Sequence, residues 1–262
     1  MIQVILVFLW SMSGSAWAGE PRTVTFPSGK LTLSGFLYKP EGNGPFPAVL
    51  YNHGSDLKPG SKPELGKFFT NHGYVFFVPH RRSHGRSPSD RFVDSLIAQG
   101  LRGVVALHEV HLEDQLAALD YLKGLSFVET HKISVAGCSY GGIQTILAVE
   151  ANAEKMLGLR AAIDFFGAAI TWAKASDLRG RMLRAVGKAT VPILFVQAEN
   201  DYDLAPSRDL AKELDRLGKP NRVIIFPPYG QTAADGHGKF CSQGVDVWGT
   251  DVLSFLAQNL EK

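Results

Sequence analysis

Apolar residues recur along the chain with two periods, and these periods predict alternating strands and helices. Short runs that are apolar throughout, or at every second position, are typical of strands, whereas apolar positions three or four residues apart are typical of helices. Strands are predicted over residues 22–26, 31–38, 48–51, 74–78, 132–136, 161–166, 192–198 and 222–226. Helices are predicted over residues 63–73, 103–124, 171–186, 207–217 and 245–260, and another after residue 142.

This order of elements favours the α/β class, in which helices cover both faces of a parallel sheet. No internal repeat, low-complexity tract or long linker divides residues 19–262, so we expect one domain there. The helix over residues 171–186 either caps the mouth of a site or, as we expect, packs in the ordinary way. The segment after residue 226 is predicted to be a long loop rich in proline and glycine.

The first 18 residues resemble a targeting segment. Residues 2–10 are nearly all apolar, and Ser15-Ala16-Trp17-Ala18 places small residues where a signal peptidase cleaves. No Lys or Arg precedes the apolar run, which leaves an uncleaved anchor and a plain first strand as alternatives. We expect cleavage near Ala18, export to the periplasm or the medium, and no stable membrane association afterwards.

The composition is that of an ordinary globular protein. The chain has 262 residues, of which 45% are hydrophobic and 20% charged, and its formal net charge is +2. Its longest basic run is Arg81-Arg82, so no nucleic-acid partner is expected. The sequence does not indicate an oligomeric state.

The most informative motif is Gly137-Cys138-Ser139-Tyr140-Gly141, between a predicted strand and a predicted helix. A serine on a tight strand-to-helix turn is the nucleophile elbow, in which glycines allow neighbouring backbone to pass close by. A serine hydroxyl needs a base to accept its proton and an acid to orient that base. The motif therefore predicts Ser139 as a nucleophile.

The base and the acid are expected after later strands, because the carboxyl ends of parallel strands meet at one edge of the sheet. His237 follows the last predicted strand and is our candidate base. Asp201 is the preferred acid, with Asp203 as the alternative, whereas Asp164 is expected to make a structural hydrogen bond. The order Ser, Asp, His is the one found in α/β-hydrolases.

Two backbone N–H groups are needed to stabilise the negative charge that develops during acyl transfer. One is expected from Tyr140, the residue after the nucleophile, and the other from Ser55 in the loop after the strand over residues 48–51. His108 and His111 lie three apart on a predicted helix, without the H-E-x-x-H spacing of a zinc site. We predict no metal and treat this pair as part of a charged helix surface.

The two cysteines allow two interpretations. Cys138 precedes the candidate nucleophile and Cys241 follows His237 by four residues, so the two thiols come near one another if Ser139 and His237 meet. In an exported protein they can form a disulfide, and otherwise they remain free buried thiols.

Together these motifs resemble the α/β-hydrolases, and among them the dienelactone-hydrolase-like group. The resemblance rests on His53-Gly54, the 83–87 segment, Gly137–Gly142, the Asp201 loop and Gly236-His237-Gly238, which follow in order along the chain. It implies an eight-stranded, mostly parallel sheet and an acyl-serine reaction cycle without a cofactor. Dienelactone hydrolases have cysteine at the centre of the elbow, where this chain has Ser139, so we expect a more general ester substrate.

We therefore predict an exported serine hydrolase that cleaves small carboxylic esters. A peptidase is the alternative with the same chemistry, although oligopeptidases of this type usually carry an additional domain. A non-catalytic binding module on the same fold is the alternative of a different class.

Overall fold

A computed structural model describes residues 19–261 of the chain. The predicted signal peptide and its cleavage site near Ala18 lie outside the described residues, so they remain predictions. Among residues 19–261, none of the helices combines the length and the apolar character needed to cross a bilayer.

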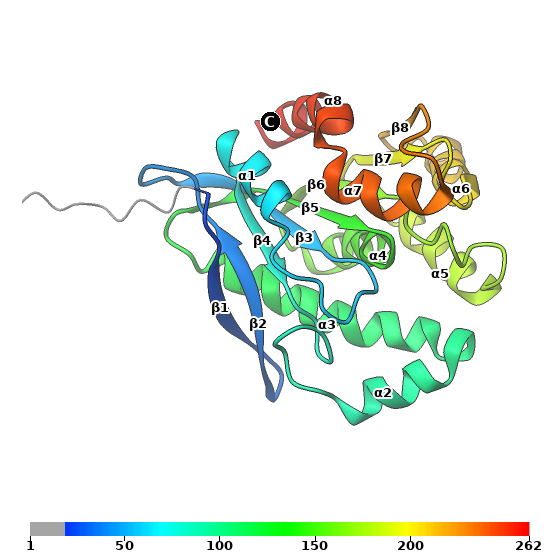
Figure 1. Cartoon of the computed structure of the whole chain (residues 1–262), viewed down its shortest axis with the longest axis horizontal. Helices are drawn as coiled ribbons and strands as arrows, with labels where there is room; N and C mark the ends of the chain where they lie inside the picture. The colour runs from blue at the N-terminus through cyan, green and yellow to red at the C-terminus, as the bar shows by residue number, and fades with distance from the viewer. Residues whose placement is uncertain (1–18, 262) are drawn as a thin grey trace, which may run out of the picture.

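One eight-stranded sheet forms the centre of the protein (Figure 1), with the strand order β1-β2-β4-β3-β5-β6-β7-β8. The pairs β1/β2 and β2/β4 are antiparallel, and every later pair is parallel. This arrangement confirms the prediction of a mostly parallel sheet. The strands are β1 Arg22–Ser28, β2 Leu31–Tyr38, β3 Phe46–Asn52, β4 Val75–Pro79, β5 Val128–Cys138, β6 Leu159–Phe165, β7 Ile193–Ala198 and β8 Asn221–Phe226.

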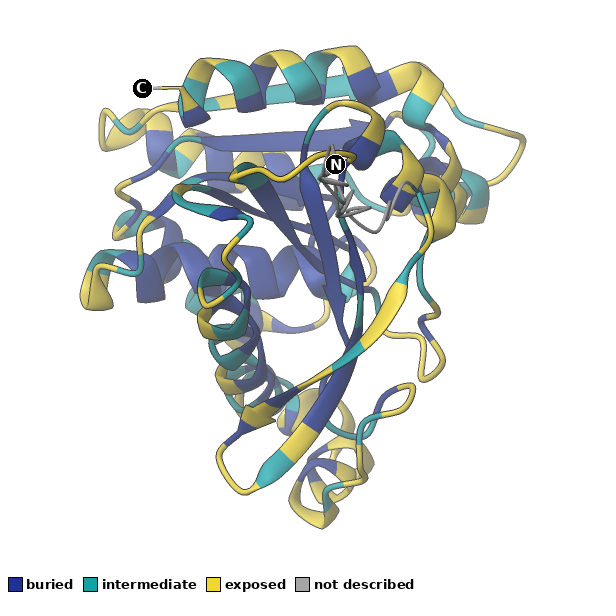
Figure 2. Ribbon diagram, turned by 90° about the vertical axis from the view of Figure 1, so that its left-hand side faces the viewer, coloured by how far each residue is buried: buried dark blue, intermediate teal, exposed yellow. Residues whose placement is uncertain are grey.

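Helices cover both faces of this sheet. The helical segments are α1 Pro63–Asn71, α2 Arg91–Ala98, η1 Gly100–Arg102, α3 Val104–Lys123, α4 Tyr140–Lys155, α5 Ser176–Gly187, α6 Ala205–Arg216, η2 Asp235–Lys239, α7 Phe240–Gln243 and α8 Val245–Leu260. Apolar residues of α3, α4, α5 and α6 pack on one face, and those of α1 and α8 pack on the other. The central strands are therefore buried on both sides, whereas β1 is largely exposed at the sheet edge (Figure 2).

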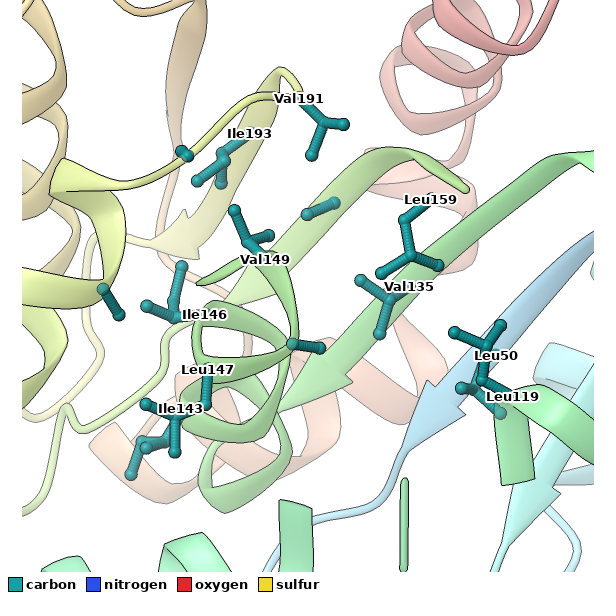
Figure 3. Close-up of a cluster of buried hydrophobic side chains, with 14 of the residues drawn as sticks. Leu50, Leu119, Val135, Ile143, Ile146, Leu147, Val149, Leu159, Val191 and Ile193 are labelled. Atoms are coloured by element: carbon teal, nitrogen blue, oxygen red, sulfur yellow. The ribbon is translucent and has the colours of Figure 1, made fainter. Parts of the chain in front are cut away.

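The alternation of side chains along each strand divides the core into two layers. In β5, Ile133 and Val135 face the layer beneath α4, whereas Ala136 and Cys138 face the layer beneath α8. Figure 3 shows part of the first layer, in which Ile143, Ile146 and Leu147 of α4 belong to the same cluster as Val135. Burial of α4 against the sheet holds the start of this helix at the end of β5.

Several predicted elements differ from the structure in extent or type. The helix α2 was not predicted, because it is short and buries only Val93 and Leu96. The helix predicted from residue 171 begins at Ser176, after a series of turns. The loop predicted to carry His237 is instead a π-helical turn, η2, whose wider backbone the loop prediction did not anticipate.

Candidate active site

Ser139 occupies a sharp turn between β5 and α4. Its backbone has φ 56° and ψ −115°, a region that residues other than glycine rarely adopt. The Ser139 N–H donates to the Phe165 carbonyl at 2.9 Å, and the Gly142 N–H donates to the Ser139 carbonyl at 2.9 Å. A Cβ at Gly141 would collide with the Asn52 carbonyl, so only glycine fits there. These contacts hold the serine in a strained conformation at the carboxyl edge of the sheet.

A chain of hydrogen bonds joins Ser139, His237 and Asp201. The Ser139 Oγ lies 2.8 Å from His237 Nε2, and His237 Nδ1 lies 2.8 Å from Asp201 Oδ1. A carboxylate oxygen only accepts, so His237 carries its proton on Nδ1 and leaves the Nε2 lone pair to the serine hydroxyl. The structure thus brings together the three residues that the sequence analysis selected.

The structure also distinguishes the two candidate acids. Asp201 is fixed by Gln197, whose Nε2 donates to its Oδ2 at 2.9 Å, and by the Tyr202 N–H, which donates to its Oδ1 at 2.6 Å. Asp203 instead accepts from the Ala205 N–H at 2.8 Å, at the start of α6. Asp201 therefore orients the histidine, whereas the Asp203 side chain satisfies a backbone N–H at the start of α6.

The turn that presents His237 is anchored on both sides. The Asn200 Nδ2 donates to the Tyr229 carbonyl at 3.0 Å, and the Tyr229 N–H donates to Asn200 Oδ1 at 2.9 Å. Asp235 accepts from the N–H groups of Gln231 and Thr232, each at 3.0 Å. The Phe166 ring lies 4.5 Å from the His237 ring, between ring centres. The hydrogen bonds of the turn therefore fix the backbone that carries the imidazole, and the Phe166 ring packs against the imidazole itself.

A cavity of about 130 Å³ adjoins Ser139. Its lining includes Ser55, Tyr140 and His108, together with apolar side chains from α3, α4 and α5. The helix α5 contributes Leu178 to this cavity while its Met182 and Val186 pack in the core. It therefore lines the site as well as packing on the sheet, so the two alternatives for this helix are not exclusive.

The loop after β3 lies directly beside the nucleophile. A Cβ at Gly54 would be 3.9 Å from the Ser139 Cβ, and the next residue, Ser55, lines the same cavity as Ser139 and Tyr140. The N–H of Tyr140 is in the first turn of α4, where the helix itself offers no acceptor. The two residues expected to donate therefore line the same cavity as the serine.

The Arg81 side chain is buried beneath this loop. Its Nη1 donates to the His53 carbonyl at 2.9 Å, and its Nη2 donates to the Gly54 carbonyl at 2.7 Å. The guanidinium carbon lies 4.6 Å from the centre of the Tyr140 ring. Burial lowers the pKa of Arg81 to about 10, so the group stays positively charged at neutral pH.

Four buried histidines surround this guanidinium, namely His53, His84, His108 and His111. Burial, followed by the charge of Arg81, lowers the pKa of all four, to about 4 for His84 and about 3 for His108. They are therefore neutral at physiological pH. His80, which is also buried, has its pKa lowered mainly by burial as well.

The positions of His108 and His111 correct the expectation of a charged helix surface. Both are buried, because the face of α3 that carries them packs against α4 and the elbow. His108 Nδ1 meets Gln144 Nε2 at 2.8 Å, and His111 Nδ1 meets the Tyr140 hydroxyl at 2.7 Å. Among residues 19–261, no three His, Cys, Asp or Glu side chains are grouped as metal ligands.

Cys138 and Cys241 meet as predicted, but as free thiols. Both are buried around the Tyr51 hydroxyl, which lies 3.1 Å from Cys241 Sγ and also interacts with Cys138. Burial raises the pKa of the Cys138 thiol, which keeps it protonated. In the structure the two residues are thus free buried thiols, and their pairing in an exported protein stays a prediction.

Asp164 has the structural role expected of it. Its Oδ1 accepts from the Gly167 N–H at 2.7 Å, and burial raises the pKa of the carboxyl to about 7. The roles of Arg81, Gln144 and Gln197 were not predicted from the sequence. The signal for Arg81 was its position two residues after β4, since β4 pairs in parallel with β3 and their ends share an edge.

Comparison with known proteins places this site in a family. The family model described as the dienelactone hydrolase family matches residues 33–238. The acylaminoacyl peptidase of Pyrococcus horikoshii has a TM-score of 0.71 at 21% identity, over 93% of this chain and 42% of that one. An esterase of Pyrococcus furiosus has a TM-score of 0.67 at 15% identity, over 97% of this chain and 96% of that one.

Est1E from Butyrivibrio proteoclasticus, solved with ferulic acid bound, has a TM-score of 0.64 at 20% identity, over 88% of this chain and 99% of that one. The chain thus spans about two-fifths of the peptidase, at 42%, but nearly the whole of the two smaller proteins. These identities are low, so the likenesses establish a shared fold. The match of the family model over most of the chain is more specific. The chain belongs to the dienelactone hydrolase family and has the α/β-hydrolase fold.

Proposed function

We propose that this hydrolase cleaves small carboxylic esters through an acyl-enzyme intermediate on Ser139. The observation that carries the proposal is the continuous hydrogen-bond path from Ser139 through His237 to Asp201, next to a cavity. A serine, a histidine that accepts its proton and a carboxylate that orients the histidine are the parts that nucleophilic acyl transfer requires.

In the proposed cycle, Ser139 Oγ attacks the ester carbonyl carbon while its proton passes to His237 Nε2. The tetrahedral intermediate then collapses, the bond to the alcohol oxygen breaks, and His237 returns the proton to the departing alcohol. Water repeats the two steps on the acyl-serine and releases the acid. Asp201 stabilises the imidazolium in both halves, and the N–H groups of Tyr140 and Ser55 stabilise the oxyanion.

The preference for esters over peptides rests on two observations. The cavity of about 130 Å³ beside Ser139 is below the roughly 300 Å³ at which drug-sized ligand pockets begin, so it suits a short or single-ring acyl group. The structures that match along their full length include an esterase and a protein with ferulic acid bound, whereas the peptidase is matched over 42% of its chain. A small serine peptidase is the second candidate, because peptidases share this fold.

The test is labelling with a fluorophosphonate probe together with hydrolysis of short p-nitrophenyl esters. We expect wild type to be labelled and active, and Ser139→Ala to lose labelling and at least about 10⁴-fold of kcat, since the steps through the acyl-enzyme need the hydroxyl. Folded wild-type protein that is neither labelled nor active would contradict the proposal. Faster cleavage of an acyl-aminoacyl p-nitroanilide than of the matching ester would favour the peptidase instead.

A further inference from the structure

We infer that Arg81 is a positioning residue that holds both walls of the oxyanion hole in register. The inference rests on the proposed function, because an oxyanion develops only if Ser139 attacks a carbonyl group. One wall is the loop His53-Gly54-Ser55 after β3, and the other is Tyr140 at the start of α4. These walls come from separate strands, and Arg81, which follows β4, contacts both.

Arg81 fixes the first wall through its carbonyl groups. Its Nη1 and Nη2 donate to the carbonyls of His53 and Gly54, at 2.9 Å and 2.7 Å. The Gly54 carbonyl belongs to the same peptide unit as the Ser55 N–H. Because that peptide unit is planar, holding its oxygen also sets the direction in which the Ser55 N–H points.

His53 supports the same peptide unit. Its Nδ1 lies 2.8 Å from the Gly54 carbonyl and 3.0 Å from Arg81 Nη2, so it either donates to the carbonyl or accepts from the guanidinium. In both cases the His53 ring lies against the two groups that set the direction of the Ser55 N–H.

Arg81 fixes the second wall through the Tyr140 side chain. Its guanidinium carbon lies 4.6 Å from the centre of the Tyr140 ring, which is the geometry of a cation–π contact. The Tyr140 ring also stacks on His108, with ring centres 3.9 Å apart, and its hydroxyl meets His111 Nδ1 at 2.7 Å. The residue whose backbone N–H faces the oxyanion is thereby held by its side chain.

The positive charge of Arg81 also lies close to the oxyanion hole. Its hydrogen-bond partners are the carbonyl groups of His53 and Gly54 and the His53 ring, and its other neighbouring rings are neutral histidines and a tyrosine. The nearest carboxylate that influences it, Asp114, is bound by Arg82 at 2.7 Å. A buried cation that is not paired directly with a carboxylate favours a negative charge nearby, such as the one that forms on the substrate oxygen.

Arg82 provides a matched control in the next position of the chain. Its guanidinium binds Asp114 at 2.7 Å, Glu113 at 3.3 Å and Asp90 at 3.4 Å, so it ties the segment after β4 to α3 and to the start of α2. The hydrogen bonds of its guanidinium go to these carboxylates and not to the 53–55 loop or Tyr140. Both side chains are largely shielded from solvent, so a general effect of losing a shielded arginine should appear at both positions.

The experiment compares Arg81→Lys and Arg81→Gln with Arg82→Lys and Arg82→Gln in the full chain. It measures kcat, KM and the inhibition constant of phenylboronic acid, which forms a tetrahedral adduct with an active serine. All rates are normalised to the sites titrated by a fluorophosphonate, so that unfolded protein is not counted. For both Arg81 variants we expect kcat to fall about 10- to 100-fold and the inhibition constant to rise by a similar factor, with KM within about twofold.

For the Arg82 variants we expect kcat and the inhibition constant to stay within about twofold of wild type, with a lower melting temperature. The inference is overturned if the Arg81 variants, per titrated site, keep wild-type kcat and boronic-acid affinity, because Arg81 would then be merely structural. An equal loss at both arginines would overturn it as well. If Ser139→Ala retained hydrolysis, the proposed function itself would fail, whatever the arginine variants showed.

Discussion

Ser139 lies between His237 and a group of four other histidines, and the two sides have opposite surroundings. On one side, His237 is hydrogen-bonded to the carboxylate of Asp201. On the other side, His53, His84, His108 and His111 are packed around the cation of Arg81. Their rings make hydrogen bonds with carbonyls, an amide, a hydroxyl and the Arg81 guanidinium itself. Histidine is thus placed beside a negative charge on one side of Ser139 and beside a positive charge on the other side.

The difference shows how the turn that carries Ser139 can serve both proton transfer and charge stabilisation. A carboxylate beside an imidazole stabilises the protonated form, which suits a group that must take up a proton and return it. A cation beside buried imidazoles keeps them neutral, so they pack as rigid polar side chains and do not compete for the proton. The two sides of Ser139 are therefore suited to proton transfer and to charge stabilisation respectively.

The largest effect is expected on the carboxylate side. Replacing Asp201 with Asn removes the charge and lets the amide donate to His237 Nδ1, which favours the wrong tautomer. We expect kcat to fall about 10³- to 10⁴-fold for Asp201→Asn, as carboxamide substitution does in a Ser-His-Asp site. The measurement is kcat for a short p-nitrophenyl ester at neutral pH.

Asp203→Asn is the matched control for that substitution. Asp203 accepts from the Ala205 N–H, and an Asn side chain can accept the same hydrogen bond. The kcat of Asp203→Asn should stay within about threefold of wild type. The hydrogen bond to the Ala205 N–H is worth only on the order of 1 kcal/mol of stability. A greater loss at position 203 than at position 201 would reverse the assignment of the acid.

A smaller effect is expected from the hydroxyl of Tyr140 on the opposite side. Tyr140→Phe removes the hydrogen bond to His111 but keeps the ring against Arg81 and His108. Because one such bond is worth roughly 1 kcal/mol, we expect kcat to fall no more than about fivefold. Tyr38→Phe, which loses a bond to the Ser61 carbonyl at 3.0 Å, is the control, and equal losses in the two variants would show that the contact with His111 has no special role.

The smallest effect at neutral pH is expected at His84. The folded-state pKa of about 4, lowered by burial and then by Arg81, is below the ordinary value of 6.5, so its contribution to stability is present above pH 6.5 and lost as the pH falls toward 4. His84 Nδ1 donates to the Arg82 carbonyl at 3.0 Å, and in His84→Asn the amide can replace that donor without titrating. Urea unfolding should therefore show a shallower loss of stability in the variant, by up to about 2–3 kcal/mol at pH 4.

At pH 7.5 the two proteins should agree within about 1 kcal/mol, because the wild-type imidazole is neutral both folded and unfolded. Stability profiles that run parallel from pH 7.5 to pH 4 would show that His84 does not carry the acid sensitivity of the Arg81 side.

Much of the fold could be predicted because apolar periodicity is set by burial. The bounds of β2 and α8 were predicted to the residue, since each has a regular apolar pattern against the core. The helix α2 was missed because Phe92 and Ile97 are exposed, which obscures its buried stripe. The π-helical turn of η2 depends on anchors such as Asn200, which lies 37 residues before His237, so a local pattern does not reveal it.

The candidate site was predictable to the extent that topology orders it. Ser139, Asp201 and His237 follow the parallel strands β5, β7 and β8, and the rule that loops at one edge meet was enough to select them. The choice between Asp201 and Asp203, two residues apart, required the hydrogen-bond geometry. The role of Arg81 required knowledge that β4 lies beside β3, since the contact joins residues 27 and 28 positions apart.

The order of the strands also has a consequence for the newly synthesised chain. The loop at residues 53–55, Arg81 and Ser139 follow β3, β4 and β5, and β3 pairs with both of the other two strands. Asp201 and His237 instead follow β7 and β8. Because a chain emerges from the ribosome N-terminus first, the charge-stabilising side can assemble while the residues that move the proton are still being made. An unfinished chain then holds a serine without its base, and the proposed hydrolysis requires that the last strand has joined the sheet.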